Sequence, residues 1–323
     1  MFTPGRELSG AFYREVVRPQ LHGRPHAAAL LGWGSDVLDF DTERSTDHGW
    51  GPRLLIFSEG AADLRLELPE EFAGWPVRYG WDDVAPQHHV TITDLPPWLV
   101  EHMGVDATRD LRIEDWLATP QQKLLEVVGG AVYADEVGEL TRVRERLTWY
   151  PDQVWRWMLA CQWRRIAQEE AFVQRAAEVG DDLGSAVTAA RIVRDLMRLA
   201  LLMARRYAPY GKWLGSAFGA LDHGDGLDRQ LRATALGDAY VAVARRHNAL
   251  GITEPVEPTL RSYHGRPAEV LDAERFVQAC LATVTDPALR ALPLIGGIDQ
   301  WVDSADVLSD PQVYRRLITN FGH

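Results

Sequence analysis

The 323-residue sequence predicts an α+β protein, in which a mixed sheet with helices is followed by a helical bundle. Short apolar runs separated by glycine, proline and aspartate fill the first part of the chain and are typical of strands. After Tyr150, apolar residues recur every three or four positions over long stretches, which indicates helices. We therefore expect two domains, an α/β domain over residues 1–150 and a helical bundle over residues 151–323.

The first domain should begin with an amphipathic helix over residues 7–20, which Pro19 ends because it lacks the N–H group of a helical hydrogen bond. The stretch AAALLGWGS at 27–35 is a short apolar element that closes in glycine turns. Four later runs are predicted as strands, namely RLLIF (53–57), LRLEL (64–68), VRYGW (77–81) and HHVTIT (88–93).

The second domain should consist of helices. Residues 152–179 and 185–207 each carry a helical pattern, and the Gly180-Asp181-Asp182 segment between them is typical of a C-cap followed by an N-cap. Two further helices are expected near residues 227–248 and 270–285. The core of this bundle should contain three clustered tryptophans, Trp155, Trp157 and Trp163.

The composition is that of a folded globular protein, with 46% hydrophobic and 25% charged residues. The formal net charge of −12 argues against a large nucleic-acid interface, which needs a basic face, but it permits a small-molecule substrate. No apolar run approaches the roughly 20 residues of a membrane span, and the first residues lack the apolar core of a secretion signal. Cys161 and Cys280 are isolated in helical patterns, which favours buried thiols and leaves a disulfide open. We expect a cytoplasmic protein.

The segment from Gly32 to Phe57 carries the strongest functional signal. Between its two apolar ends lie a Gly34-Ser35 turn and an acidic loop, whose members are Asp36, Asp39, Asp41, Glu43, Arg44, Ser45, Thr46, Asp47 and His48. Carboxylates gathered in one loop repel each other, and a divalent cation is the usual compensation. Because the N–H groups of a Gly-Ser turn can bind phosphate, the segment predicts phosphoryl chemistry.

The spacing in this segment resembles the nucleotidyltransferase superfamily, in which a Gly-Ser turn precedes an Asp-x-Asp or Asp-x-Glu pair. Here eleven residues separate Ser35 from Asp47. The block FDTERSTDHGWGPR at 40–53 is similar to the domain-of-unknown-function family 4037, as are ELSGAFYREVVRP near the start, LTWYPDQVW at 147–155 and YAPYGKWLGSAF at 207–218. The resemblance implies a nucleotidyltransferase-like domain followed by helices, the layout of aminoglycoside and lincosamide nucleotidyltransferases.

The same resemblance implies a reaction and its cofactors. Mg²⁺ (or Mn²⁺) and an NTP, with ATP expected, would supply a nucleoside monophosphate to a hydroxyl group of a small molecule. Gly34 and Ser35 would hold a phosphate of the nucleotide, and Asp47 would be the first metal ligand.

Four further residues of the chain are candidates for the site. Asp41 would be a replacement metal ligand or the base, a role also open to Glu43, whereas Arg44 and Lys212 would stabilise charge or bind the nucleotide. Each has a structural alternative: the acids can cap turns and pair with arginines, and Lys212 can extend from a packed turn.

Gly49 departs from the family pattern, which places an acid two residues after Asp47. A second hypothesis is therefore a nucleotide- or small-molecule-binding protein without catalysis, in which Gly49→Asp should increase metal affinity. A third is a metal-independent hydrolase that acts on a glycoside with carboxylates of residues 39–47. Asp94, after the last predicted strand, is another candidate for the missing carboxylate.

Overall fold

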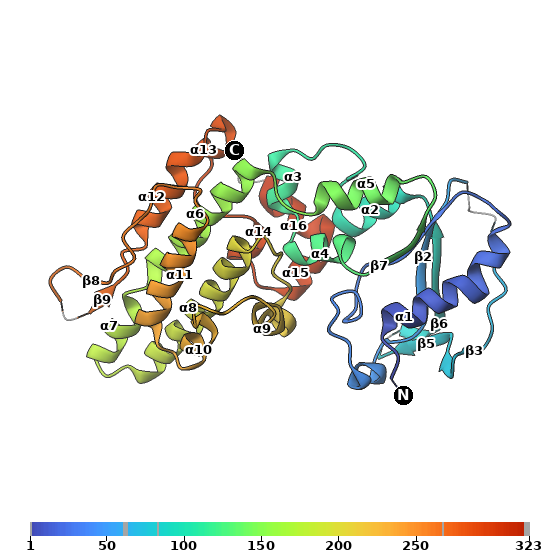
Figure 1. The fold of residues 1–323 in the computed structure, drawn as a ribbon, viewed down its shortest axis with the longest axis horizontal. Coiled ribbons are helices and arrows are strands. Elements are labelled where there is room, and N and C mark those ends of the chain that lie inside the picture. Colours follow the sequence, from blue (N-terminus) through green and yellow to red (C-terminus); the bar gives the residue numbers. More distant parts are fainter. Residues whose placement is uncertain (1, 61–63, 83, 267, 320–323) are drawn as a thin grey trace. The chain divides into compact units, whose positions relative to one another are not determined.

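In a computed structural model, which describes residues 2–60, 64–82, 84–266 and 268–319, the chain forms two compact units (Figure 1). The first unit comprises Met1–Asp115 and Gln122–Thr148, and the second comprises Trp116–Gln121 and Trp149–His323. The first unit contains a mixed sheet and the second is helical, which confirms the predicted α+β class. The predicted domain boundary at residue 150 stays a prediction, because two compact units in one structure do not show that each part folds alone.

The sheet of the first unit has five strands in the order β5-β6-β2-β1-β7. Its strands are β1 (Ala27–Leu30), β2 (Arg53–Phe57), β5 (Arg78–Trp81), β6 (Val84–Thr93) and β7 (Ala131–Asp135). β2 and β6 are parallel, and the other neighbouring pairs are antiparallel. The strands predicted at 53–57, 77–81 and 88–93 are confirmed, whereas β7 had no counterpart in the prediction.

The strand predicted at residues 64–68 is wrong. Leucines at 64, 66 and 68 pack against the core of the first unit, so the alternating pattern reflects real burial. However, the side-chain amide of Gln20 donates to the carbonyl of Glu67 at 2.9 Å and accepts from its N–H at 2.7 Å. A side chain therefore takes the place of a neighbouring strand at this point. The strands that follow it are the short pair β3 (Glu71–Phe72) and β4 (Trp75–Pro76).

The predicted first helix is present but changes geometry along its length. It begins as the α-helix α1 (Gly5–Phe12), continues as a π-helical turn (Tyr13–Val17) and ends as a 3₁₀ turn (Arg18–Leu21) around Pro19. Its apolar side chains cover one face of the sheet. They form a core cluster with strand residues, whose members include Phe12, Tyr13, Val17, Leu21, Ala28, Leu54, Ile56 and Val90.

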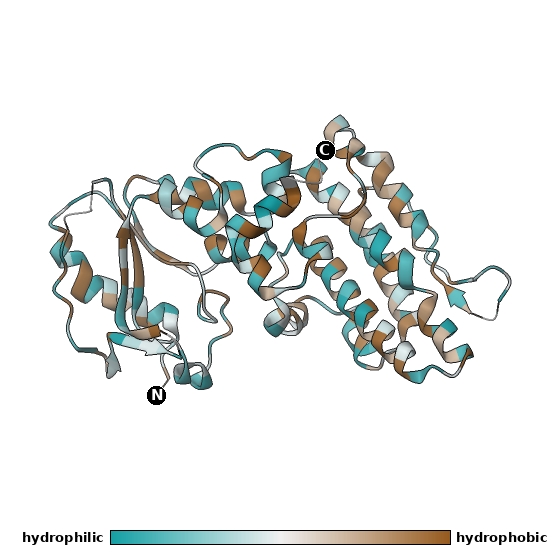
Figure 2. Ribbon diagram, turned by 180° about the vertical axis from the view of Figure 1, so that it is seen from behind, coloured by the Kyte–Doolittle hydropathy of each residue, from teal (hydrophilic) through white to brown (hydrophobic). Residues whose placement is uncertain are grey.

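Further helices complete the first part of the chain: α2 (Leu95–Met103), α3 (Ile113–Ala118), α4 (Gln121–Val128) and α5 (Glu139–Leu147). Along β2, Phe57 faces the side of the sheet opposite to Leu54 and Ile56. Its ring centroid lies 5.3 Å from that of Trp98 in α2. Arg144 of α5 donates hydrogen bonds of 2.7–3.0 Å to three carbonyls at the end of α4, which fixes the entry into β7. Figure 2 shows the central strands as largely hydrophobic and these helices with both hydrophobic and hydrophilic residues.

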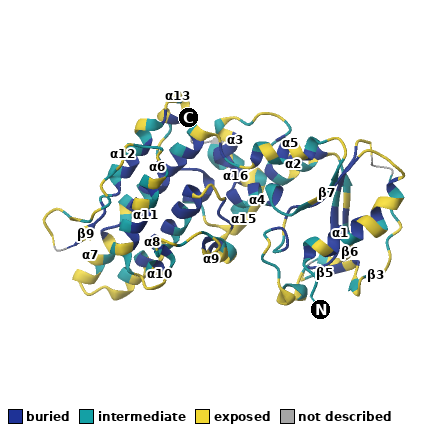
Figure 3. Cartoon of the chain, viewed as in Figure 1, coloured by how far each residue is buried: buried dark blue, intermediate teal, exposed yellow. Residues whose placement is uncertain are grey.

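The second unit is built around α6 (Asp152–Glu169), which contacts both α8 (Asp182–Met203) and α12 (Glu274–Thr283). The other helices of this unit are α7 (Phe172–Glu178), α9 (Gly211–Gly219), α10 (Leu227–Arg232), α11 (Leu236–Ala249), α13 (Pro287–Ala291), α14 (Ile298–Trp301), α15 (Ala305–Ser309) and α16 (Pro311–Thr319). Figure 3 shows buried residues along α6 and mostly exposed ones on α7. The three predicted core tryptophans of α6 are buried, which confirms that prediction.

Two of the predicted helical stretches are each divided in two, and α8 and α12 begin and end a few residues away from the predicted bounds. The stretch 152–179 is two helices, α6 and α7, and the stretch 227–248 is divided at Thr234, whose φ is +53°. The predicted cap is present: the carboxylate of Asp181 accepts a hydrogen bond from the N–H of Gly184 at 2.8 Å. The described part of the chain contains no helix with both the length and the apolar character needed to cross a bilayer.

Candidate functional site

The acidic loop lies between β1 and β2, and the first unit holds its first half in place. After β1, the N–H of Gly32 donates to the carbonyl of Glu126 in α4 at 2.8 Å. At the start of α1, the guanidinium of Arg6 donates to the carbonyls of Asp36 and Val37, each at 2.8 Å, and pairs with Asp39 at 3.3 Å. The loop is therefore a fixed part of the unit.

A buried ion pair between Asp36 and Arg53 forms the base of the loop. The Nη2 atom of Arg53 lies 2.5 Å from Oδ1 of Asp36, and its Nε lies 3.3 Å from Oδ2. The side chains are 3% and 6% exposed, so the charges compensate each other away from water. Gly34 lies against both groups with a φ of +121°, and a Cβ atom there would overlap them. This close approach explains why the turn needs glycine.

Asp41, a predicted metal ligand or base, closes the N-terminus of α1. Its Oδ2 accepts from the backbone N–H of Gly5 at 2.7 Å and from the indole N–H of Trp50 at 3.3 Å. The residue before α1 is Pro4, whose side chain cannot cap the helix, so Asp41 supplies the acceptor and the favourable negative charge from a distant segment.

The other predicted acids of the loop lie on an exposed 3₁₀ turn, Glu43–Asp47. Glu43 is exposed, and Arg44 pairs with Asp47 with 3.5 Å between Nε and Oδ2. Asp41 and Asp47 thus have separate partners. Within the described residues, no three His, Cys, Asp or Glu side chains form a group that could hold a metal ion. The metal-binding and catalytic roles of these residues stay predictions.

Gly49 faces aromatic rings. Its φ is +60°, and a Cβ atom there would lie 3.2–3.3 Å from ring carbons of Trp81 and 3.6 Å from the ring of Trp33. Together with His48 and His89, these two tryptophans form what we call the aromatic platform. The ring centroids of Trp33 and Trp81 are 4.9 Å apart, those of Trp81 and His89 are 5.4 Å apart, and those of His48 and Trp81 are 6.1 Å apart.

The register between β2 and β6 explains why His89 belongs to the platform and Asp94 does not. Arg53 is paired with His89 and Phe57 with Thr93, so Asp94 follows the end of β6 that is opposite to the loop. Burial lowers the pKa of His89, which favours the neutral ring, and its Nε2 lies 3.0 Å from the carbonyl oxygen of Tyr79. The position beside the loop on β6 is thus occupied by an aromatic ring instead of a carboxylate.

The remaining predicted residues are Ser35 and Lys212. Ser35 is half-buried, and its carbonyl accepts from the N–H of Phe40 at 2.8 Å, which closes the turn after Gly34. Lys212 is exposed at the start of α9 in the second unit, with Nζ 5.1 Å from the ring centroid of Trp213. Its role toward a nucleotide stays a prediction. The acidic loop was predicted from the sequence, whereas Trp33, Trp81 and His89 were not among the predicted site residues.

Comparisons with known proteins place part of the chain in a family. No curated protein matches the sequence. One similar solved structure is a nucleotidyltransferase-like protein from Exiguobacterium sibiricum 255-15, with 12% identity, 88% of this chain and 91% of that chain covered, and a TM-score of 0.33. The sequence model of the family described as "Domain of unknown function (DUF4037)" matches residues 116–214. Residues 116–214 are therefore a DUF4037 region, which confirms the family that the sequence resembles.

Proposed function

We propose that the protein binds a nucleotide, with the base stacked on the aromatic platform beside the Gly34-Ser35 turn. The observation that carries this proposal is the position of Trp33. Trp33 is 42% exposed, and the guanidinium of Arg53 lies 4.2 Å from the centroid of its ring. A ring supported by a buried cation is a preorganised surface, and stacking of a base on such a ring contributes about 1–3 kcal/mol.

The platform also gives Gly49 a role that an acid could not fill. A side chain at this position would press against Trp81 and reduce the surface open to a base. A carboxylate would add negative charge to a loop that already contains several. Glycine at this position therefore supports ring access at the expense of metal ligation.

Nucleotidyl transfer with Mg²⁺ is the second candidate function, favoured by the spacing of Gly34, Ser35 and Asp47. In this hypothesis a nucleoside monophosphate from ATP passes to a hydroxyl of a small-molecule acceptor. The separate partners of Asp41 and Asp47 favour binding over transfer. Mg²⁺ that is already bound to the phosphates of ATP would reduce the repulsion from the loop without a two-carboxylate site. The proposal includes a cytoplasmic location, which fits two buried free thiols.

Replacing Trp33 with alanine is expected to weaken ATP binding about tenfold or more, because the stacking surface is lost. Isothermal titration calorimetry of the full chain with ATP and Mg²⁺ measures this effect. Trp75→Ala is the matched control, since Trp75 contacts Trp50 and lies outside the platform. Equal loss in both variants, or no binding of any NTP by the unmodified protein at millimolar concentration, would contradict the proposal.

Gly49→Asp is expected to weaken ATP binding and to leave Mn²⁺ affinity unchanged. The positive φ strains any side chain, and the new Cβ would meet Trp81. Gly49→Ala has the same steric effect without the charge, so the difference between the two variants isolates the carboxylate. Titration with Mn²⁺, followed by its electron paramagnetic resonance signal, measures the metal affinity. A gain of Mn²⁺ affinity in the aspartate variant would contradict this expectation, because it would show that the loop holds a metal once the acid is restored.

A further inference from the structure

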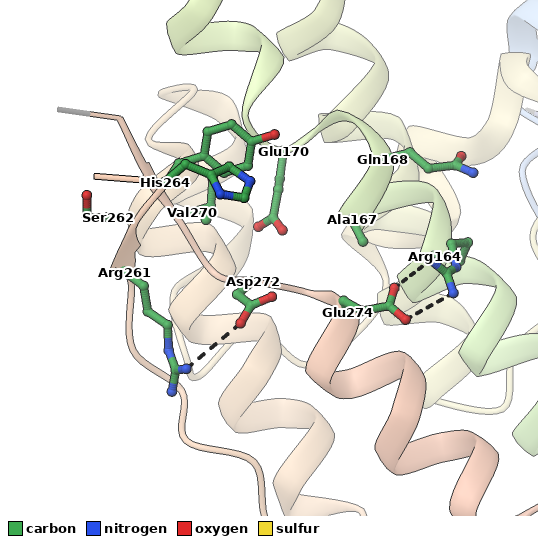
Figure 4. A pocket seen from close by; sticks show the side chains of 11 residues that line it. Arg164, Ala167, Gln168, Glu170, Arg261, Ser262, His264, Val270, Asp272 and Glu274 are labelled. Carbon is green, nitrogen blue, oxygen red and sulfur yellow. Dashed lines mark hydrogen bonds and ion pairs between the residues drawn. The ribbon is translucent and has the colours of Figure 1, made fainter. Parts of the chain in front are cut away.

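The second unit contains a cavity of about 420 Å³ that lies far along the chain from the acidic loop. It is lined by the C-terminal end of α6, the strands β8 (Arg261–Ser262) and β9 (Glu269–Val270), Tyr263 and His264 after β8, and the start of α12 (Figure 4). This volume is in the range of sites for small molecules. We propose that the cavity binds a small organic cation, a molecule that carries an ammonium group.

The walls of the cavity combine apolar and aromatic surface with carboxylates. Ala167 and Val270 supply apolar contacts, and Tyr263 and His264 add two rings whose centroids are 4.5 Å apart. Ammonium groups bind favourably to carboxylates and to the faces of aromatic rings. The lining therefore offers both kinds of contact that recognise an amine attached to a short carbon chain.

The arginines that line the cavity already have acidic partners. Arg164 pairs with Glu274 at 2.7 Å, and Arg261 lies 3.8 Å from Asp272 and 3.0 Å from Glu257. Figure 4 shows both pairs of the lining as dashed lines. Because these guanidinium groups are engaged, the cavity offers little to an anionic ligand.

Glu170 is the remaining charged residue of the lining, and it is 6% exposed. Its two oxygens accept from the backbone N–H groups of Leu271 at 2.8 Å and Ala273 at 2.9 Å. Across the described residues, no arginine, lysine or histidine makes an ion pair with it. Asp272 has a second cationic partner in Arg275, whose Nε lies 3.4 Å from its Oδ2. Glu170 is thus the one lining carboxyl without an ion pair among the described residues, and a ligand can supply a positive charge beside it.

Asp272 acts electrostatically on Glu170. Burial raises the pKa of the Glu170 carboxyl to about 7 against the opposing effect of the backbone N–H groups, and the charge of Asp272 acts in the same direction as burial. The charge of Asp272 therefore disfavours the charged form of Glu170. Figure 4 shows both among the side chains around the cavity. An ammonium group beside them would replace repulsion by two attractions.

The test uses the full chain with 1,4-diaminobutane as the cationic probe and 1,4-butanediol as a neutral probe of similar length. Calorimetric titration is expected to show binding of the diamine and none of the diol. Binding of both probes with equal affinity, or of neither at millimolar concentration, would overturn the inference. The result is independent of ATP binding, because the diamine is proposed to bind to the second unit and ATP to the first.

Asp272→Asn is the variant that tests the site, because asparagine keeps the shape and tolerates the positive φ of +57° at this position. We expect it to weaken diamine binding about tenfold, which corresponds to about 1.4 kcal/mol. Glu178→Gln removes the same charge from an exposed position on α7 outside the cavity and should change affinity less than about twofold. Equal effects of the two substitutions would show that the diamine is attracted nonspecifically by an acidic protein, and would overturn the proposed site. Tyr263→Leu should also weaken binding, and circular dichroism melting confirms that each variant folds.

Discussion

Replacing Arg53 with alanine is expected to lower the free energy of unfolding of the first unit by about 3–5 kcal/mol. The substitution leaves the Asp36 carboxylate buried and without its cation, and the cost of an uncompensated buried charge is much larger than that of a lost surface contact. The ring of Trp33 also loses the guanidinium that supports it. Urea denaturation of the full chain, followed by hydrogen exchange to separate the two units, measures the effect.

Arg44→Ala is the matched control for this prediction. Arg44 pairs with an acid of the same loop, but its side chain is 93% exposed and water screens the pair. We expect little change in stability from this variant. The double variant Asp36→Ala/Arg53→Ala should recover part of the loss, because no charge is then left alone in the core. If Arg53→Ala destabilises the unit no more than Arg44→Ala does, the pair does not hold the loop.

The second large effect is expected at Glu126, which lies in α4 below the loop. Burial acts to raise the pKa of this carboxyl, but the hydrogen bond from His102 and the charge of Lys123 outweigh it and lower the pKa from 4.5 to about 2. His102 Nε2 and Lys123 Nζ lie 3.0 Å and 3.1 Å from Oε2 of Glu126. Since the folded-state pKa is lower than the unfolded one, the stabilisation is present above about pH 4.5 and is lost as the pH falls toward 2.

The size of this stabilisation is about 3 kcal/mol at neutral pH, from the displacement of the pKa. Glu126→Gln keeps the shape of the side chain but has no charge to titrate. We expect the variant to be less stable at pH 7 and to show a flatter decline in unfolding free energy between about pH 5 and pH 2. Glu101→Gln, on the exposed side of α2, is the control. A variant that loses stability with pH in parallel with the unmodified protein would show that Glu126 is not the group that titrates.

Local patterns predicted much of the fold but less of the candidate site. The run RLLIF is a strand with the predicted bounds, because burial on both faces requires an apolar run. The alternating leucines at 64, 66 and 68 also predicted a strand. Their backbone is instead bonded by the side chain of Gln20, which donates to the carbonyl of Glu67, 47 positions later in the chain. Periodicity reports burial and does not identify the partner that satisfies the backbone.

The residues of the acidic loop could not be separated by sequence alone for the same reason. Asp36, Asp41 and Asp47 are the same residue type in similar local sequence. In the structure, Asp36 is paired in the core, Asp41 caps a helix and Asp47 is exposed. Those differences come from Arg53, Gly5 and Arg44, of which the first two are brought in by tertiary packing. Glu170 is another case, because the backbone groups that hold it lie about 100 residues later.

The contacts between the start of α1 and the acidic loop have a consequence for how ligand binding could be observed. The amide of Gly5 and the guanidinium of Arg6 are bonded to loop residues 30 or more positions away, which couples the loop to the first helical turn. Any rearrangement of the loop around a ligand is thereby transmitted to the beginning of the chain. A fluorophore or isotope label placed there would act as a remote reporter of occupancy, without any alteration of the binding surface itself.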